Sequence, residues 1–405
     1  MKKLFAMFFI CLLFTSLEWG EAKVKPGIEV LLERKINILK GKRVGLITNP
    51  TGVDSKLRST VDLLSKRTDV KLMALFGPEH GVRGDIKAGE TIKSFTDKKT
   101  GLPVYSLYGK TKKPTKEMLK GLDVLIYDIQ DIGIRPYTYI YTMALAMEAA
   151  KENELTFIVL DRPNPLGGNL VEGPVLEEKF KSFIGLYPIP YVYGMTVGEL
   201  ADFINNEFKI FADLVVVEME EWKRDMIFPD TGLEWVPTSP HVPHWETAFF
   251  CAATGGIGEL DRINVGVGYT MPFELIGAPW VEGEKLADML NQFELPGVYF
   301  RPLYYRPYYF YFSNIQLSGV QMHVYDFRKF RPFATQIYIL YAINKLFPES
   351  NLFETKRIGM FNKAMGTDKV VKYIRENKKP EWILGRLRAS LQEYLDKREK
   401  YLRYK

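Results

Sequence analysis

The first half of the chain alternates short apolar runs with segments of helical spacing. The apolar runs occupy residues 43–49, 70–77, 122–128 and 155–161. The helical segments between and after them span residues 55–67, 138–153 and 196–208. The last of these opens with Thr196 and Glu199 at the spacing of a capping box. Runs this apolar are typical of strands buried on both faces, so the pattern predicts a doubly wound, mostly parallel sheet with helices on each side.

The second half of the chain follows a looser pattern. Proline, tryptophan and tyrosine are frequent from about residue 215 to 325, and aromatic residues crowd positions 299–312. Further strands are predicted at residues 214–219 and 319–324, followed by helices at 331–346, 370–376 and 382–401. We expect a boundary near residue 210. It divides the chain into an α/β domain of residues 23–210 and a smaller α+β subdomain of residues 211–405.

The N-terminal 22 residues have the layout of a secretory signal peptide. Lys2 and Lys3 precede an apolar run at residues 4–14, and Gly20 and Ala22 occupy the −3 and −1 positions of a cleavage site. The pattern predicts an exported protein, periplasmic or extracellular, with no membrane span after cleavage of residues 1–22. The alternative is a retained membrane anchor, for which the run is short, since a spanning helix needs ~20 residues.

Composition narrows the class of protein. The 405 residues include 55 Lys+Arg and 49 Asp+Glu, and 46% of them are hydrophobic, which is typical of a globular protein. The length suggests about two domains. The two charge signs are interspersed, which weighs against a nucleic-acid partner. Two cysteines exclude a disulfide scaffold, and Cys251 sits in an apolar stretch typical of a buried small residue. Nothing in the pattern indicates an oligomeric state.

Familiar signatures of cofactor and nucleophile chemistry do not occur in the sequence. The first apolar run leads into Pro-Thr-Gly and not into a glycine-rich dinucleotide fingerprint, and the sequence contains no Walker loop. A G-x-S-x-G elbow does not occur either, which argues against a serine hydrolase. We therefore expect no cofactor.

Polar residues follow the predicted strands, at the edge where ligands bind in open parallel sheets. They are Asn49, Glu79, His80, Asp128, Gln130, Asp131, Asp161, Arg162 and Asn164. An aspartate after a strand is often only a turn former or a helix cap. Glu79 fits that alternative least well, because it lies between Pro78 and His80 in a loop flanked by glycine.

Paired carboxylates are what cleavage of a glycosidic bond requires. One carboxylic acid protonates the leaving oxygen, and a second acts as nucleophile, activates water or stabilises the oxocarbenium charge. Burial beside aromatic neighbours raises the pKa of such an acid. Tyrosines offer flat faces for sugar rings, or simply half-buried packing, at positions 137, 139, 141, 191 and 193.

A zinc site is the alternative chemistry. His80, His241, His244 and Asp128 together have suitable ligand types. Pro243 lies between the last two histidines, so that pair does not lie on one helix, and loop imidazoles near a ligand or solvent are the simpler interpretation. His323 falls in a strand pattern and is expected to be structural.

Several long motifs together resemble the exo-β-N-acetylmuramidases, a bacterial family once classed as a domain of unknown function. The motifs lie at residues 76–84 (FGPEHGVRG), 128–139 (DIQDIGIRPYTY), 161–168 (DRPNPLGG), 172–174, 194–200 (GMTVGEL), 239–240, 272–280 (PFELIGAPW), 366–368 and 401–404. The resemblance covers essentially all of residues 27–405. It implies a Rossmann-like doubly wound sheet, a smaller α+β subdomain, and an active-site cleft between them.

The same resemblance implies an activity and a set of site residues. It implies release of N-acetylmuramic acid from the non-reducing end of peptidoglycan fragments, so peptidoglycan-derived saccharides are the expected partners. Glu79 matches the glutamate of the G-P-E-H-G motif and takes the principal catalytic role, with Asp128 and Asp131 as further catalytic candidates. The expected substrate-binding residues are His80, Arg83, Gln130, Arg135, Tyr137, Asp161, Arg162, Asn164, Tyr193 and His241.

The sequence departs from the family pattern near residue 265. Many relatives carry Ser-Glu-Gly-Arg-Gly where this chain has Asn264–Gly268, so Val265 and Val267 replace a glutamate and an arginine. Met271 stands in place of an arginine, His241 in place of an asparagine and Tyr193 in place of a histidine. The Val265 and Val267 replacements support the alternative of a cell-wall sugar-binding protein that has lost catalysis.

Overall fold

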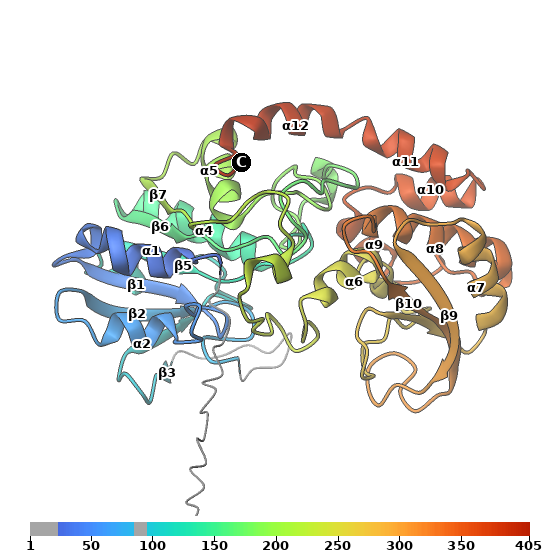
Figure 1. Cartoon of the computed structure of the whole chain (residues 1–405), viewed down its shortest axis with the longest axis horizontal. Helices are drawn as coiled ribbons and strands as arrows, with labels where there is room; N and C mark the ends of the chain where they lie inside the picture. Colours follow the sequence, from blue (N-terminus) through green and yellow to red (C-terminus); the bar gives the residue numbers. More distant parts are fainter. Residues whose placement is uncertain (1–22, 85–94) are drawn as a thin grey trace, which may run out of the picture.

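A seven-stranded sheet organises the first domain of the computed structural model, which describes residues 23–84 and 95–405 (Figure 1). The strand order is β3-β4-β2-β1-β5-β6-β7, and every neighbouring pair is parallel except β3 with β4. The strands are β1 (Arg43–Thr48), β2 (Lys71–Gly77), β3 (Phe95–Thr96), β4 (Pro103–Ser106), β5 (Val124–Asp128), β6 (Thr156–Leu160) and β7 (Leu214–Val217).

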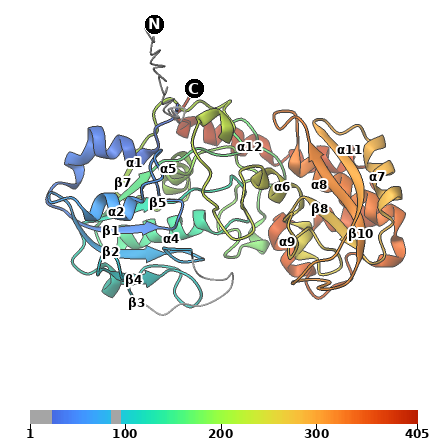
Figure 2. The ribbon, with the colours of Figure 1, turned by 60° about the horizontal axis from the view of Figure 1, so that its bottom comes forward.

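Helices cover both faces of this sheet, as the apolar runs predict (Figure 2). Helices α4 (Tyr139–Glu152) and α5 (Val197–Glu207) share one core with Ile47 of β1. Helices α1 (Gly27–Val30) and α2 (Thr60–Ser65) share the other with its neighbour Leu46. Successive side chains of a strand point to opposite faces, so a continuous apolar run supplies both cores. The doubly wound α/β fold is confirmed.

Local details both follow and depart from the predictions. The Thr196–Glu199 capping box forms at the start of α5. The helix expected over residues 55–67 shortens to α2, because Asp54 accepts the N–H groups of Lys56 and Arg58 and holds the preceding segment in a turn. Strands β3 and β4 carry partly exposed residues and no continuous apolar run, which is why the pattern does not predict them.

The second domain contains a three-stranded antiparallel sheet of order β8-β10-β9. Its strands are β8 (Leu275–Ala278), β9 (Val298–Tyr305) and β10 (Leu317–Val324), and its helices are α6 (Glu246–Thr254), α7 (Gly283–Gln292), α8 (Pro332–Leu346), α9 (Ile358–Met365) and α10 (Lys369–Arg375). One apolar core joins α6, α7 and α8 to the sheet and includes Cys251, which is buried as predicted. This domain is the expected smaller α+β unit.

The C-terminal segment returns to the first domain. Helices α11 (Pro380–Arg388) and α12 (Leu391–Arg398) replace the single helix expected over residues 382–401, and they run from the second domain to the first across the top of Figure 1. Strand β7 also belongs to the first sheet although it follows the boundary expected near residue 210. The first domain therefore takes residues from both sides of that boundary.

Short helical turns complete the described chain. Helix α3 spans Lys116–Leu119, a π-helical turn spans Leu31–Lys35, and 3-10 turns span Ile36–Leu39, Glu178–Phe180, Phe228–Thr231, Ile257–Glu259, Pro348–Ser350 and Glu399–Tyr401. The predicted signal peptide at residues 1–22 lies outside the described residues. Among residues 23–84 and 95–405, no helix is both long enough and apolar enough to cross a membrane.

Candidate active site

Glu79 lies in the turn after β2, at the carboxyl edge of the sheet. His80 has a φ of 71° and Gly81 a φ of 76°, and the N–H of Gly81 donates to the carbonyl of Pro78 at 2.9 Å. A histidine in the left-handed region costs of order 1–3 kcal/mol, and such strain persists only where the surrounding structure holds it. The turn leaves the side chains of Glu79 and His80 half-buried, so they remain within reach of solvent.

Hydroxyl groups gather around the Glu79 carboxylate. Thr138, which precedes α4, donates from Oγ1 to Glu79 Oε2 at 2.9 Å. The Tyr108 hydroxyl also faces this carboxylate. Burial, together with the hydrogen bond to Glu79, raises the pKa of Tyr108 to about 12. Burial likewise raises the pKa of Tyr139, and the Glu79 charge adds to the effect.

Two tyrosines join this edge to the segment that leads into the second domain. Tyr137 donates to Thr238 Oγ1 at 2.7 Å, and Tyr139 donates to the Thr238 carbonyl at 2.5 Å. Their rings meet edge to face with centroids 4.9 Å apart. Tyr137, predicted to contact substrate, thus lies beside the Glu79 turn and orients the segment that carries His241.

His241 links the site to the second domain. Its Nε2 lies 2.9 Å from the hydroxyl of Tyr309, and the two rings stack with centroids 6.1 Å apart. Burial lowers the pKa of His241, and His80 contributes a further lowering. Glu79, His80, His241 and Tyr309 therefore form a series that begins at the sheet edge and ends on the loop between β9 and β10.

Asp128 is enclosed in an ion pair. Its Oδ1 accepts Arg162 Nε at 2.6 Å and its Oδ2 accepts Thr60 Oγ1 at 2.5 Å, while Arg162 also donates to the Val53 carbonyl at 2.8 Å. The Asp128 side chain is fully buried. Both carboxylate oxygens already hold donors in the protein interior, so this geometry favours a structural role for Asp128 and Arg162.

Asp161 and Asn164 hold the chain in place after β6. Asp161 accepts the N–H of Gly198 at 2.8 Å and the hydroxyls of Thr196 and Tyr404 at 2.7 and 2.5 Å. A β-carbon at Gly198 would lie 2.7 Å from Asp161 Cγ, so glycine is required there. Asn164 donates to the Met195 carbonyl at 2.9 Å. These contacts fix the start of α5 against the sheet.

Asp131 differs from the other strand-end aspartates. Its Oδ2 accepts the Gly133 N–H at 2.7 Å and the hydroxyl of Tyr193, whereas its Oδ1 is buried without a hydrogen-bond partner among the described residues. Burial raises the pKa of Asp131 to about 6. Tyr193 and Asp131, both predicted site residues, thus form one hydrogen-bonded pair, and burial, to which the Asp131 charge adds, raises the pKa values of Tyr137 and Tyr139.

Comparison with protein families decides the membership of the chain. The model described as "Exo-beta-N-acetylmuramidase NamZ, N-terminal" matches residues 44–246, and the corresponding C-terminal model matches residues 252–404. The chain belongs to the exo-beta-N-acetylmuramidase NamZ family. The family resemblance inferred from the motifs is confirmed.

Relatives of known name or structure agree with membership in the NamZ family. The chain is 52% identical to the peptidoglycan beta-N-acetylmuramidase NamZ of Bacillus subtilis (strain 168), over 94% of this chain and 92% of that protein. A DUF1343 family protein from Bacteroides fragilis NCTC 9343 superposes with a TM-score of 0.90 at 48% identity, covering 95% of this chain and 100% of that one. A second DUF1343 protein from the same organism gives a TM-score of 0.77 at 29% identity, covering 94% and 99%.

Three further predicted residues lie in contacts that do not reach Glu79. Arg135 is fully buried and donates to the carbonyls of Lys363 and Ala364 at 3.3 and 2.9 Å, which ties the first domain to the end of α9. Arg83 makes a two-pronged ion pair with Asp97, with both distances 3.1 Å. Gln130 donates to the Pro163 carbonyl at 2.7 Å and borders a cavity of about 20 Å³.

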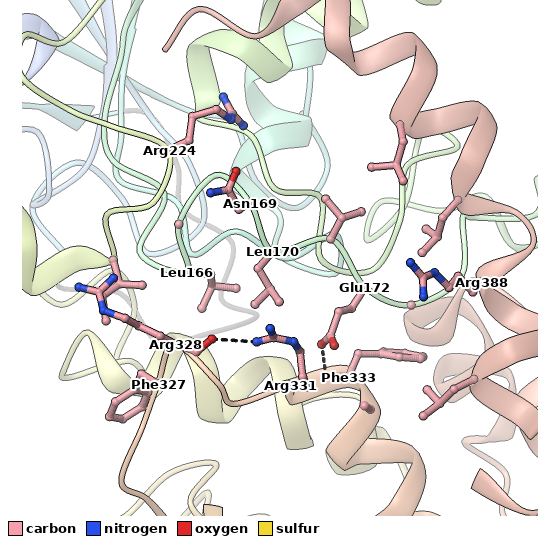
Figure 3. Close-up of a pocket in the computed structure, with 18 of the residues that line it drawn as sticks. Leu166, Asn169, Leu170, Glu172, Arg224, Phe327, Arg328, Arg331, Phe333 and Arg388 are labelled. Carbon is pink, nitrogen blue, oxygen red and sulfur yellow. Dashed lines mark hydrogen bonds between the residues drawn. The ribbon is translucent and has the colours of Figure 1, made fainter. Parts of the chain in front are cut away.

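A cavity of about 780 Å³ lies where the two domains and the C-terminal helices meet (Figure 3). Arg331, Arg388 and Leu170 are among its lining residues, and none of the residues predicted for catalysis or substrate binding lines it. Glu172 faces this cavity and accepts the Phe333 N–H at 3.0 Å, and burial raises the pKa of Glu172 to about 7. A cavity between the domains therefore exists, but the strand-end acids do not line it, contrary to the active-site cleft expected there.

The histidines do not assemble a metal site in the described part of the chain. Within it, no group of three or more His, Cys, Asp and Glu side chains is arranged to hold a metal ion. His244 borders a separate hollow with Glu274 and Gln321, away from the Tyr309 contact of His241. His323 lies in β10 and accepts from Arg301 Nε at 3.3 Å, consistent with its predicted structural role.

The departures from the NamZ family pattern near residue 265 lie inside the second domain. Val265 and Val267 are both buried in its apolar core. Asn264 donates to the carbonyls of Val267 and Tyr311 at 3.0 and 3.1 Å, which fixes the fold of this loop. The two valines thus act as packing residues in this chain.

Several contacts of Glu79 and His241 are not apparent from the sequence. Tyr108 belongs to none of the motifs, and Thr138 lies inside one without an indication that it would meet Glu79. Tyr309 lies in the aromatic stretch at 299–312, whose composition is unusual but whose partner, His241, is 68 residues away. Only the folded chain brings these hydroxyls to the site.

Proposed function

We propose that this chain is an exo-acting β-N-acetylmuramidase, a glycosidase that releases N-acetylmuramic acid from the non-reducing end of peptidoglycan fragments. One observation carries the proposal. The glutamate of the family motif stands at the carboxyl edge of the sheet, half-buried, with the hydroxyls of Thr138 and Tyr108 directed at its carboxylate. The named relative at 52% identity supports the substrate class.

Glu79 acts as the proton donor to the departing sugar in this proposal. Its position in a tight turn lets the carboxyl group approach a substrate from the sheet edge, while Thr138 and Tyr108 fix its orientation. A positioned acid of this kind contributes ~10²–10⁴ in rate. His80, the neighbour of Glu79 in the chain, and His241, whose pKa is lowered by burial and by His80, are the side chains that we expect to contact the sugar hydroxyls.

Of the two further aspartates predicted for catalysis, the geometry favours a role in the site for Asp131 over Asp128. Both oxygens of Asp128 are occupied by Arg162 and Thr60. One oxygen of Asp131 has no partner among the described residues, and the pKa of about 6 lets this group change protonation near neutral pH. Because Asp131 is buried, we assign it a positioning role that acts through its hydrogen bond with Tyr193.

Hydrolysis of a chromogenic N-acetylmuramide tests the proposal. Replacing the carboxylic acid in Glu79→Gln removes the transferable proton and should lower kcat by ~10²–10⁴ while the protein stays folded. Glu152→Gln, an exposed glutamate of α4 paired with Lys113, is the matched control and should retain full activity. Equal turnover by wild type and Glu79→Gln would remove Glu79 from the mechanism. Binding of the muramide without turnover by the wild type would favour the sugar-binding alternative.

We also propose that the protein is exported and acts on cell-wall fragments during peptidoglycan recycling. The support is the basic and apolar layout of residues 1–22. Expression in a bacterial host should give a mature protein outside the cytoplasm whose first residue is Lys23. A protein that keeps Met1 and fractionates with membranes would instead indicate a retained anchor.

A further inference from the structure

Exposed aromatic side chains are concentrated where β9 leads into the loop before β10. Tyr304 is 62% exposed, Tyr308 68%, Tyr309 52% and Phe310 51%. We refer to these four side chains as the aromatic platform. Large aromatic groups are normally withdrawn from water, so an exposed cluster of them marks a surface that binds something. The loop lies at the lower edge of the second domain in Figure 1.

The loop that carries the aromatic platform is held in a strained and specific conformation. Phe310, Phe312 and Asn314 all have positive φ, at 70°, 61° and 60°. Three such residues within five positions persist only because the surroundings restrain them. The N–H of Tyr308 donates to the Gly268 carbonyl at 2.7 Å, and Ser313 Oγ donates to the Tyr308 carbonyl at 2.9 Å. The rings are therefore presented by a fixed backbone.

Gly268 shows how closely this loop packs against its support. Gly268 has a φ of 92°, and a β-carbon there would lie 1.9 Å from the Tyr309 carbonyl oxygen. Tyr269 stacks on Tyr308 with centroids 6.0 Å apart and an angle of 21° between the rings. Asn264 Nδ2 adds a bond to the Tyr311 carbonyl at 3.1 Å. The segment 264–269 thus packs against the loop that carries the aromatic platform.

The aromatic platform is continuous with the candidate active site. Tyr309 joins the platform to the site, because its hydroxyl lies 2.9 Å from His241 Nε2. The electrostatic influence of His80 on His241 places these two imidazoles near each other, and His80 is the neighbour of Glu79 in the chain. A ligand that leaves Glu79 toward the second domain therefore passes His241 and meets the aromatic platform next.

We propose that the aromatic platform binds the sugar rings on the leaving-group side of a glycan whose terminal muramic acid lies at Glu79. The inference rests on the proposed function, because an enzyme that removes the terminal sugar must leave the rest of the chain on an adjacent surface. The faces of β-linked sugars carry axial C–H groups that pack against aromatic rings, while the tyrosine hydroxyls reach the sugar hydroxyls.

The chemistry of the loop fits a glycan better than a lipid or an apolar protein surface. Three of the four rings are tyrosines, whose hydroxyls favour a hydrated ligand, and Ser313 and Asn314 follow them. Arg306, exposed at the start of the loop, adds a cation suited to the lactyl carboxylates of further muramic acid residues.

The proposal is tested by comparing the hydrolysis of a short and a long substrate. The probes are a chromogenic N-acetylmuramide, which has no sugar on the leaving side, and a tetrasaccharide of alternating N-acetylmuramic acid and N-acetylglucosamine. In Phe310→Ala and Tyr308→Ala, the ratio of kcat/KM for the tetrasaccharide to kcat/KM for the chromogenic substrate should fall roughly five- to tenfold, mainly through KM, as expected for loss of one ring stacked on a sugar.

Phe211→Ala is the matched control. Phe211 is also a phenylalanine with positive φ, 54°, and is 56% exposed, but it lies just before β7, at the opposite edge of the sheet from Glu79. Its ratio should equal that of the wild type. An unchanged ratio in both platform variants would overturn the proposal, as would a dimer of the wild type that Phe310→Ala dissociates.

The test separates failure of the aromatic platform from failure of the proposed function. If the wild type does not hydrolyse the chromogenic muramide, the proposed function fails, and calorimetric binding of the tetrasaccharide to wild type and Phe310→Ala still decides the role of the aromatic platform. Equal affinity of these two proteins would overturn the proposal. A similar loss on both substrates, together with a lowered melting temperature in both variants, would mean that these rings are structural and would also overturn it.

Discussion

Carboxylates follow β2 on one side of the central strand and β5 and β6 on the other, yet the two regions use them differently. Glu79, in a strained turn, is half-buried and meets only hydroxyl groups in the contacts described above. Asp128 and Asp161 stand at the ends of straight strands, fully buried, with every oxygen engaged. The same sequence signature, an acid after an apolar run, thus yields a half-buried carboxylate within reach of solvent in one place and fully buried, engaged carboxylates in the other. The difference lies in the partners that later parts of the chain supply.

Removing Asp128 should give the largest change in stability. Asp128→Ala leaves the Arg162 charge buried without its partner, which should lower the free energy of unfolding by about 3–5 kcal/mol. Asp123→Ala, at the other end of β5, breaks the more exposed pair with Arg43 and should change stability much less. Urea denaturation measures both. Equal losses would mean that the Asp128 pair is no more than a surface contact.

The pH dependence of stability should single out Asp131. Its pKa is raised from an ordinary value near 3.8 to about 6 by burial, so the native state binds the proton more tightly than the unfolded chain does. This contribution to stability is fully present below pH 4 and is lost as the pH rises through 6. The loss approaches 3 kcal/mol at most, from about 1.4 kcal/mol per pKa unit.

Asp131→Asn should therefore flatten the fall in stability between pH 4 and 6, measured as urea midpoints against pH. Tyr193→Phe removes the hydroxyl that lowers the Asp131 pKa, so the same fall should move to higher pH. Identical profiles for wild type and Asp131→Asn would show that this carboxyl does not titrate there. Asp131 would then no longer differ in its titration from Asp128, whose two oxygens already accept hydrogen bonds.

A smaller effect is expected at the C-terminus. Tyr404→Phe deletes one donor to the buried Asp161 carboxylate and should cost roughly 1–3 kcal/mol in the free energy of unfolding. Tyr401→Phe, whose hydroxyl donates to the less enclosed Glu207 at 2.8 Å, is the matched control and should cost less. Thermal melts of the two variants measure the difference. A larger loss for Tyr401→Phe would reverse the order of importance assigned to the two contacts.

Much of the first domain can be predicted from the sequence, because its elements are encoded by patterns of neighbouring residues. The apolar runs define β1, β2, β5 and β6 because a strand buried on both faces has no polar position to interrupt it. Thr196 and Glu199 predict the start of α5, because a capping box is formed by four consecutive residues and needs no distant partner. Glu79 is identifiable for a similar reason, since the turn that presents it is encoded by its immediate neighbours.

What the sequence does not reveal depends on contacts between distant segments. The pairing of Asp128 with Arg162 and Thr60 requires three segments to fold together, so the same aspartate reads equally well as a catalyst or as a structural group. Arg135 resembles a substrate ligand in its motif, but its guanidinium reaches carbonyls more than two hundred residues away. The meeting of His241 with Tyr309 likewise depends on the placement of the second domain.

Tyr404 completes the first domain. It donates to Asp161 at 2.5 Å and accepts the N–H of Met219 at 2.9 Å, so its side chain closes the end of β6 and the segment after β7. During synthesis, the strands of the sheet leave the ribosome well before Tyr404 does. Until Tyr404 has been made, the Asp161 carboxylate of the nascent first domain lacks one of its donors.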